Sequence, residues 1–520
     1  MPRATFWTAA VLFAALTTPT TGSAQVPCEG DAGYDAAAIE MPCRDLRRIL
    51  ELTGEAPLQT SLLARGSDPR PFTREGSPAA EPESLLSAHV LPVRLRAVAN
   101  SAYPSGGNDG LLWAGRGLST SLEAGVGVQA GPFRAAISPA IAWQQNRAFD
   151  HPASTLPGSS PYANPFMTGI IDAPLRFGPD AFTSADLGAS YARVDLFGFG
   201  AGVSNEPLWW GPGIRNSILL SNNAPGFPHL FVTTSRPLDI RIGKLDAQYV
   251  YGRLDESKWF DVDGGNDLRH FNAFAVAFSP AFAPGLSVGY SQLAHDRVRR
   301  RQPQEVLPEG FTPGNRLVGL YGRWAMPAAR FELYGEWGHD DRWVDFLDRL
   351  MEPQHAQAYL VGLQKVLGSG NRRGRLHFEL ANTFEKQAQN APRAAAIFYA
   401  HLFEIQGHTN RGQLLGAQIG PQALQQFLAV DLLTIGGFAG VFFERTVRNE
   451  RYFYDVVSRI DGHDLELTAG LRELWSRGGV DLAWEAGVSR RWNAYFEGNR
   501  TNFRGSVSAI WRPDLAIRAR

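Results

Sequence analysis

The sequence predicts an all-β fold: a large antiparallel transmembrane β-barrel of about 18 strands, preceded by a small N-terminal helical or loop segment that could plug it. Three observations lead to this prediction: an export signal at the N-terminus, segments of alternating polarity from about Leu91 onward, and no apolar run as long as a membrane helix. After the first twenty residues, the densest apolar stretch is Leu432 to Phe443, which has 12 residues and contains Thr and paired Gly. A membrane helix needs about 20.

Residues 1–24 are typical of a secretory signal peptide. Arg3 precedes an apolar core from Phe6 to Leu16, and the small residues Thr21 to Ala24 form the exit where cleavage is expected. The alternative is a buried N-terminal helix, but nothing amphipathic accompanies the apolar stretch. We therefore expect an exported protein located in the bacterial outer membrane.

Residues 25–88 form a second segment, rich in Pro, Ala and charge, which we interpret as a periplasmic or plugging element, with plain linker as the alternative. One helix is expected near Pro42 to Leu52, because its apolar side chains fall on one face and Gly54 follows as a stop. Cys28 and Cys43 are the only cysteines. In an exported chain such a pair predicts a disulfide rather than a catalytic or metal site.

Residues 89–520 carry the barrel pattern. Arg330 to Gly338 is an example: Phe331, Leu333 and Trp337 share one face, while Glu332 and its alternate neighbours share the other. About 16 to 20 such segments are expected, enough for a polar lumen. Trp511 is expected to close the last strand, with a short tail beyond it. The long connections 146–182 and 297–315 are expected on the extracellular side.

Sequence patterns that suggest catalysis or metal binding are weak. Gly285 to Gly289 matches a nucleophile elbow around Ser287, but its residues alternate along a strand. The acidic stretch 261–267 resembles a calcium loop with a misplaced Gly, so a solvated turn is preferred to a weak Ca²⁺ site. Carboxylates such as Glu332, Glu336 and Glu485 could pair as glycosidase acid and base, but polar lumen lining is the simpler interpretation. We expect no catalytic residue, metal or cofactor.

Several blocks of sequence occur in an order that resembles the Wzi capsule-assembly family. The resemblance covers most of residues 90–512 and rests on the runs Trp209-Trp210-Gly211-Pro212-Gly213, Ser217 to Pro225, Asn410 to Gly416 with Ile419-Gly420-Pro421, and the weaker Ile171 to Gly178. It implies an outer-membrane barrel, partly plugged, that binds capsular polysaccharide as a lectin and has no catalytic cycle. The N-terminal segment with its Cys pair and the non-aromatic C-terminus depart from the family pattern.

Sugar recognition requires aromatic faces, planar polar groups and, for acidic polymers, arginine. The candidate polysaccharide ligands are Trp209, Trp210, Asn222, Asn223 and Arg411. Gly211, Pro212 and Gly213 are expected to form a tight structural turn. For the Trp pair, the alternative is a membrane-interface girdle or a packing anchor. For the Asn pair, it is turn chemistry.

The leading functional hypothesis is a surface lectin that binds and retains capsular or exopolysaccharide. The alternatives are a substrate-selective channel and, with less support, an outer-membrane hydrolase. The formal net charge of −1, without a basic block, argues against a nucleic-acid partner. We expect a monomer whose partners are polysaccharide and outer-membrane lipid or lipopolysaccharide.

Overall fold

The computed structural model describes residues 41–65, 86–260, 267–298, 314–340, 346–351, 355–370, 372–385, 397–434, 436–459, 461–477, 479–513 and 516–519. The predicted signal peptide and Cys28 lie outside these residues. Cys43 is buried and is not a free thiol, but its pairing with Cys28 stays a prediction. No helix in the described ranges is long and apolar enough to cross a membrane.

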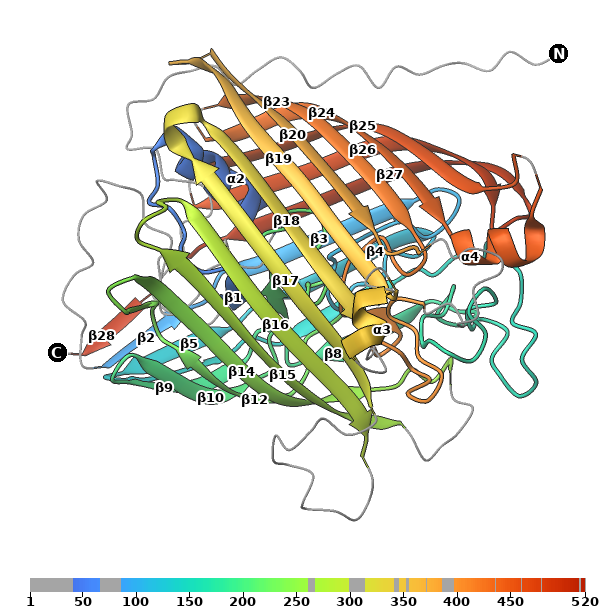
Figure 1. Ribbon diagram of the computed structural model, residues 1–520, viewed down its shortest axis with the longest axis horizontal. Coiled ribbons are helices and arrows are strands. Elements are labelled where there is room, and N and C mark those ends of the chain that lie inside the picture. The colour runs from blue at the N-terminus through green and yellow to red at the C-terminus, as the bar shows by residue number, and fades with distance from the viewer. Residues whose placement is uncertain are drawn as a thin grey trace.

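The described residues form a closed antiparallel barrel of 24 strand segments (Figure 1). These segments are β2 (Leu86–Val90), β3 (Val93–Asn100), β4 (Gly117–Glu123), β5 (Val126–Ala130), β6 (Phe133–Ile137), β7 (Ala140–Gln144), β8 (Phe182–Asp186), β9 (Tyr191–Leu196), β10 (Phe199–Ser204), β12 (His229–Thr234), β13 (Leu238–Asp239), β14 (Gly243–Asp255), β15 (Leu268–Pro280), β16 (Leu286–Arg297), β17 (Asn315–Met326), β18 (Phe331–Asp340), β19 (Gln357–Ser369), β20 (Arg372–Asn382), β23 (Leu424–Thr434), β24 (Gly437–Arg448), β25 (Asp464–Arg477), β26 (Val480–Ala494), β27 (Gly498–Trp511) and β28 (Ala516–Ala519).

Six pairs of consecutive segments each form one interrupted strand, because the two members of a pair lie between the same neighbouring strands. The chain of 24 described segments therefore crosses the height of the barrel in 18 passes. The pairs are β2/β3, β4/β5, β6/β7, β8/β9, β12/β13 and β27/β28. This agrees with the expected 18 strands. The C-terminal tail differs from the prediction, because β28 does not extend beyond the barrel. It pairs with β2, where Leu86 lies opposite Ala519, and so helps to close the wall.

Several breaks between strand segments lie at the same height of the barrel and form a line across the strands. Pro92 and Pro139 interrupt two of the strands because proline cannot donate a ladder hydrogen bond. The neighbouring breaks are Ala124–Gly125 and residues 187–190, and β10 ends beside them, with Ser204 opposite Tyr191. We call this line, which crosses the passes from β2/β3 to β10, the seam.

The two ends of the barrel differ. Turns such as Phe197–Gly198 and the 3₁₀ turn η2 (Pro327–Ala329) are short, whereas the connections at the other end include 145–181 and 383–423. Short turns are periplasmic and long loops extracellular in bacterial barrels. The long-loop end also carries α3 (Phe346–Met351), α4 (Glu450–Tyr452) and the π-helical turn η3 (Phe453–Val457), and Figure 1 shows α3 and α4 there.

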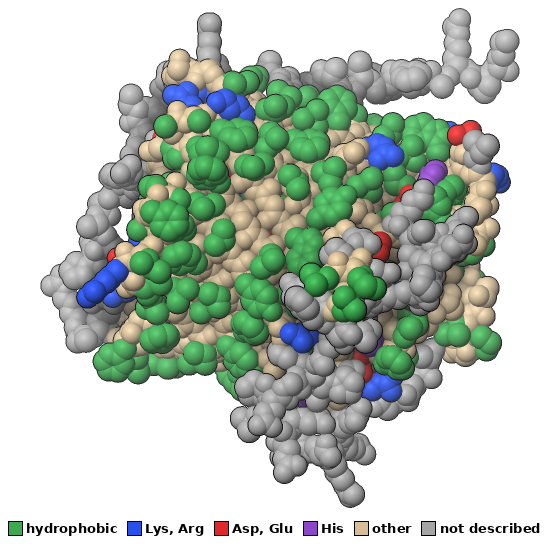
Figure 2. Space-filling view, in the orientation of Figure 1, with side chains coloured by type: hydrophobic (Ala, Val, Ile, Leu, Met, Phe, Trp, Pro, Cys, Tyr) green, Lys and Arg blue, Asp and Glu red, His purple; other side chains and the backbone are tan. Residues whose placement is uncertain are grey.

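The outer wall is apolar and the inner wall is polar, as strand alternation requires. Figure 2 shows hydrophobic side chains spread over the outer face of the barrel. On β18, Leu333 is 44% exposed on this face, whereas Glu332 and Tyr334 are buried inside, which confirms the split expected for this strand. The exposed apolar side chains form the surface that lipid contacts.

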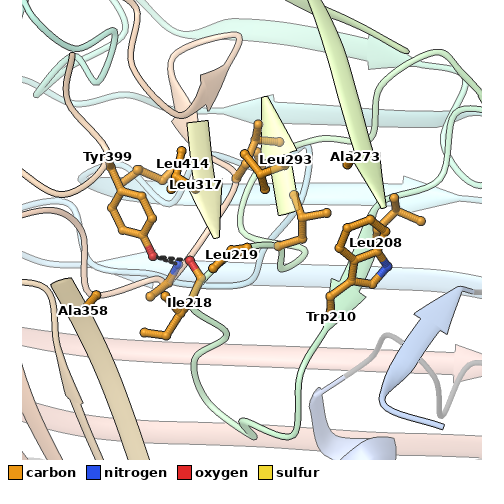
Figure 3. Packing of buried hydrophobic residues seen from close by; sticks show 14 of the residues in the cluster. Leu208, Trp210, Ile218, Leu219, Ala273, Leu293, Leu317, Ala358, Tyr399 and Leu414 are labelled. Carbon is orange, nitrogen blue, oxygen red and sulfur yellow. Dashed lines mark hydrogen bonds between the residues drawn. The ribbon is translucent and has the colours of Figure 1, made fainter. Parts of the chain in front are cut away.

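The chain itself fills the lumen. Helix α2 (Met41–Thr53), close to the bounds predicted, lies at the short-turn end against β17, β19 and η2. Strand β1 (Leu63–Arg65) pairs inside with β11 (Leu208–Trp210), and β21 (Thr409–Asn410) pairs with β22 (Gln413–Leu414). The buried apolar side chains of α2 pack in one cluster with wall residues such as Val366 and Phe438. The two strand pairs share a larger hydrophobic cluster with inward-facing wall residues (Figure 3). In it, the Tyr399 hydroxyl donates a 2.5 Å hydrogen bond to the Ile218 carbonyl oxygen.

Candidate functional site

The aromatic pair Trp209–Trp210 lies on residues 205–228, the inward segment, which enters the lumen between β10 and β12. Trp209 and Trp210 are 0% and 1% exposed. The Trp210 Nε1 donates to Gln248 Oε1 at 2.9 Å, and the Arg44 guanidinium lies 3.8 Å from the Trp209 ring centroid. Because both rings are covered by the plug and wall, the structure favours the alternative interpretation of the pair as a packing anchor, and a role in sugar binding stays a prediction. They anchor the inward segment.

The following turn wraps around two carboxylates from the wall. Glu336 on β18 accepts from the Gly213 N–H at 2.8 Å and from the Ile218 N–H at 2.7 Å. Glu379 on β20 accepts from the backbone N–H groups of residues 214, 215 and 216 at 2.9 to 3.1 Å. A Cβ on Gly211, whose φ is +126°, would lie 2.4 Å from Glu336 Oε1. The predicted structural role of the Gly-Pro-Gly turn follows from this close approach.

A second set of buried charges holds α2 against the wall. Arg48 pairs with Glu332, and Arg323 binds both Glu332 and Glu51, at 2.7 and 2.6 Å. Asp45 pairs with Arg375, whose guanidinium also lies 2.6 Å from Asp431. Burial alone would raise the pKa of Asp45, but the charge of Arg375 holds it below its usual range. Paired, hydrogen-bonded charges of this kind can remain ionised when buried.

A polar cavity of about 170 Å³ lies between the inward segment and the inner wall near the seam. Arg94 and Arg96 project into it from alternate positions of β3. Arg94 Nη1 lies 2.9 Å from Glu123 Oε1 on β4, and Arg96 pairs with Asp109. The cavity also contacts Asp186, Asn222, Ser121 and Ser508. It therefore offers guanidinium, carboxylate, amide and hydroxyl groups within one partly open cavity.

The structure separates the remaining predicted ligands. Asn222 lines the cavity, and its carbonyl oxygen accepts from the Gly110 N–H at 2.8 Å. Asn223 stabilises the fold: its Nδ2 donates to the Leu414 carbonyl at 3.1 Å. Arg411 lies next to the cavity, since its Nη1 contacts Asp186 Oδ2 at 2.7 Å and its side chain is 34% exposed. Asn222, Asn223 and Arg411 are thus brought near one site, since Asn223 Oδ1 accepts a hydrogen bond from the N–H of the cavity-lining Asn108 at 3.2 Å, and the Trp pair is not.

Sequence reasoning missed the charged residues of the cavity. The available signal was the spacing of Arg94 and Arg96, because positions i and i+2 of a strand share a face. It could not show that this face points inward, or that Asp109 and Asp186 come from distant segments to meet it. Among the described residues, no group of His, Cys, Asp and Glu is arranged to hold a metal ion. The acidic stretch 261–266 lies outside the described residues.

The closed apolar wall and self-filled lumen define the class: an outer-membrane β-barrel with an internal plug. The family profile described as "Capsule assembly protein Wzi" matches residues 108–294 and 309–501, so the chain belongs to the Wzi capsule-assembly family. No curated protein matches it.

Solved structures resemble the fold at low sequence identity. An Escherichia coli structure is described as Wzi, an outer-membrane protein involved in group 1 capsule assembly and a carbohydrate-binding β-barrel. It is 14% identical with a TM-score of 0.53, and the match covers 82% of this chain and 84% of that chain. Acinetobacter baumannii OccAB2 is 12% identical with a TM-score of 0.42, and the match covers 83% of this chain and 100% of that chain.

Proposed function

We propose that this protein binds capsular or exopolysaccharide through the polar cavity beside the seam, and that this binding is its contribution to capsule assembly. The observation that carries the proposal is the convergence of Arg94, Arg96, Asp109, Asp186 and Asn222 on one partly open cavity inside the barrel. Membership of the Wzi family and the fold shared with the carbohydrate-binding E. coli protein support it.

The chemistry of the cavity suits part of a polymer. Sugar hydroxyls both donate and accept, so they match a site with guanidinium donors and carboxylate acceptors. The lining sets Arg94 and Arg96 beside the carboxylates of residues 109, 123 and 186, so its charges largely compensate one another and it suits the hydroxyls of a neutral or an acidic polymer. The volume of about 170 Å³ is below the roughly 300–1,000 Å³ of pockets for drug-sized ligands. We therefore expect one or two sugar units to enter while the rest of the chain stays outside.

The plug weakens the channel alternative, because the lumen is occupied by packed hydrophobic elements. A hydrolase would need a carboxyl pair free to exchange protons. Glu332 is held by two arginines, Glu336 accepts two backbone N–H groups, and Glu485 pairs with Arg215 at 3.2 Å. Ser287 faces Ser279 at 2.6 Å, so the elbow-like motif lacks its base there. A binding protein fits these contacts better than an enzyme.

The test measures binding of acidic polysaccharide fragments to the purified full-length barrel by calorimetry. Arg96→Gln should weaken binding by about 1 to 3 kcal/mol, the cost of losing a charged hydrogen bond. Arg411 contacts the cavity through its ion pair with Asp186, so Arg411→Ala should weaken binding less than Arg96→Gln does. Arg490→Gln is the matched control, because Arg490 is exposed and bonds only Thr501 among the contacts described.

Equal affinity of Arg96→Gln and the control, with both proteins folded, would contradict the cavity as the site. Release of reducing ends during long incubation with the wild-type protein would contradict the assignment to a binding protein.

A further inference from the structure

The wall beside the polar cavity is incomplete above the seam, on the side of the long loops. β10 ends at Ser204 and β12 begins at His229, and the chain between them runs into the lumen. Above this level, β8 pairs with β7 and, among the described residues, has no strand on its other edge. Two half-strands are therefore missing between β8 and β14.

The β21–β22 hairpin occupies part of this gap. The Asn410 Oδ1 accepts from the Asp255 N–H at 3.1 Å, and the Arg411 N–H donates to the Asp255 carbonyl at 2.8 Å. On the other side, Arg411 Nη1 binds Asp186 Oδ2 at 2.7 Å. A hairpin from the plug thus spans from the edge of β14 to the end of β8, and bridges part of the gap with polar contacts rather than with a strand ladder.

An apolar groove of about 660 Å³ lies at the lower edge of the gap. Its lining includes Leu187, Val203 and Leu230, which are 60%, 50% and 55% exposed toward the lipid side. It also includes Tyr191 and His229, which are buried and face the lumen. Because one groove contacts residues of both faces, it notches the wall instead of lying flat on it.

The groove and the polar cavity are back to back. Along the same stretch of chain, Asp186 and Gly188 line the cavity, whereas Leu187 and Ser190 line the groove. The inward segment also contributes to both sites, since residues 225 and 226 line the cavity and Pro228 lines the groove. A partition about one backbone thick therefore separates an apolar site open to the bilayer from a polar site in the lumen.

We propose that the groove holds an acyl chain of a glycolipid from the outer leaflet, so that the saccharide head of the same molecule lies at the polar side of the partition. This assignment of a lipid-linked saccharide rests on the proposed function for its sugar-binding part. The protein would then engage its glycan laterally from the membrane as well as from the external medium.

Two observations favour a lipid with an anionic, sugar-bearing head over other occupants. The groove is set in the apolar surface that faces the bilayer, where hydrocarbon is the surrounding solvent. Its upper rim carries Arg253, whose side chain is 53% exposed, and His270, which hydrogen-bonds Tyr251 at 3.0 Å. Arg253 also lies 3.2 Å from Asp255, but a guanidinium has five N–H donors and can bind a phosphate as well.

The experiment uses native mass spectrometry of the full-length barrel after delipidation and incubation with one lipid at a time: lipid A, phosphatidylglycerol, or a free long-chain fatty acid. Ala192→Trp fills the groove from its outer side. Ala439→Trp on β24 is the matched control, because Ala439 is also a half-buried position in the wall, far along the barrel from the groove. Heat-modifiable migration checks that both variants are folded.

We expect the wild type and Ala439→Trp to retain one lipid A, and Ala192→Trp to lose at least about tenfold in occupancy, since each excluded CH₂ is worth about fourfold. Retention should follow the order lipid A, phosphatidylglycerol, fatty acid. Equal retention by the two variants, or preference for the fatty acid, would overturn the inference. Binding of lipid-free polysaccharide separates the two proposals: Ala192→Trp should bind it normally and Arg96→Gln should not.

Discussion

The two sides of the barrel are built differently. The regular wall, β14 to β20 and β23 to β27, consists of strands of 10 to 15 residues. The segmented wall, β2 to β13, consists of pieces of two to eight residues. The regular wall supplies the carboxylates and arginines that hold the plug. The segmented wall supplies the cavity and most of the groove.

The difference shows how one sheet serves two purposes. A continuous ladder places side chains at fixed intervals, so charges on β17, β18, β20, β23 and β25 can match the spacing of α2. Where Pro92 and Pro139 interrupt the ladder, backbone and side chains turn away from the regular arrangement and leave space. Rigid anchoring and open volume therefore occur on different sides of the lumen.

The largest expected effect is on the regular wall. Arg375→Ala removes one of the two arginines that pair with Asp45 and Asp431, and leaves only Arg472 beside them. Leaving two buried carboxylates with less compensation should cost about 3 to 5 kcal/mol in the free energy of unfolding. Urea titration of the protein in lipid vesicles, followed by tryptophan fluorescence, measures this loss. Arg490→Ala, at an exposed position, should change it by less than about 0.5 kcal/mol.

A midpoint for Arg375→Ala equal to that of the control would show that the charged lattice does not hold the plug, and the comparison between the two walls would lose its energetic basis.

A smaller effect is expected at the turn that rests on Glu336. Gly211→Ala forces a Cβ to within 2.4 Å of a carboxylate oxygen at a φ of +126°. Such strain costs of the order of 1 to 3 kcal/mol. Gly505→Ala is the matched control, because a Cβ there would meet nothing within 4 Å. Limited proteolysis of residues 205–228 should be faster in Gly211→Ala only, and equal rates would disprove the need for glycine.

The barrel was predictable from the sequence because the alternation of apolar and polar residues along each strand is a local pattern. Alternation along Arg330 to Gly338 already separates Leu333 from Glu332, and the structure places them on opposite faces of the wall. The export signal argues against a protein of the cytoplasm, and the lack of a helix-length apolar run in the sequence argues against a helical membrane protein. Few other fold classes then remain. The number of passes agreed because long alternating segments dominate the chain. The final strand was misjudged, since the polar end of β28 does not look like a membrane strand.

The site was less predictable because its contacts are non-local. Trp209 and Trp210 have the chemistry of a sugar platform, and only the pairing of β11 with β1 inside the lumen shows that they are covered. Arg96 and Asp109 approach because a loop folds back against the wall. Ion pairs of this kind depend on the inward path of segments that carry no alternating pattern, so no periodicity could reveal them.

The smallest expected effect concerns the hairpin that completes the segmented wall. Glu256 follows β14, and its carboxylate accepts a 2.5 Å hydrogen bond from Gln406 Nε2, on the loop that leads into the hairpin. Burial, reinforced by the charge of nearby Asp172, raises the pKa of Glu256 from its usual 4.5 to about 7. The docked loop therefore binds the proton more tightly than the undocked loop does.

The sign of the pH dependence follows. Protonation of Glu256 stabilises the docked state of residues 400–408. This stabilisation is fully present below about pH 4.5 and is lost as the pH rises through about 7. Hydrogen exchange of these residues, corrected for the intrinsic rate, should be faster at pH 8 than at pH 5. Burial also raises the pKa of Glu404, in the same loop, to about 7, so the test is made in a Glu404→Gln background. In that background Glu256→Gln keeps a neutral side chain at every pH and should remove the remaining difference. Glu497→Gln, an exposed residue in a turn at the same end, should keep it. A pH dependence that survives Glu256→Gln would mean that another group controls the hairpin, and that closure of the segmented wall is not linked to this carboxyl.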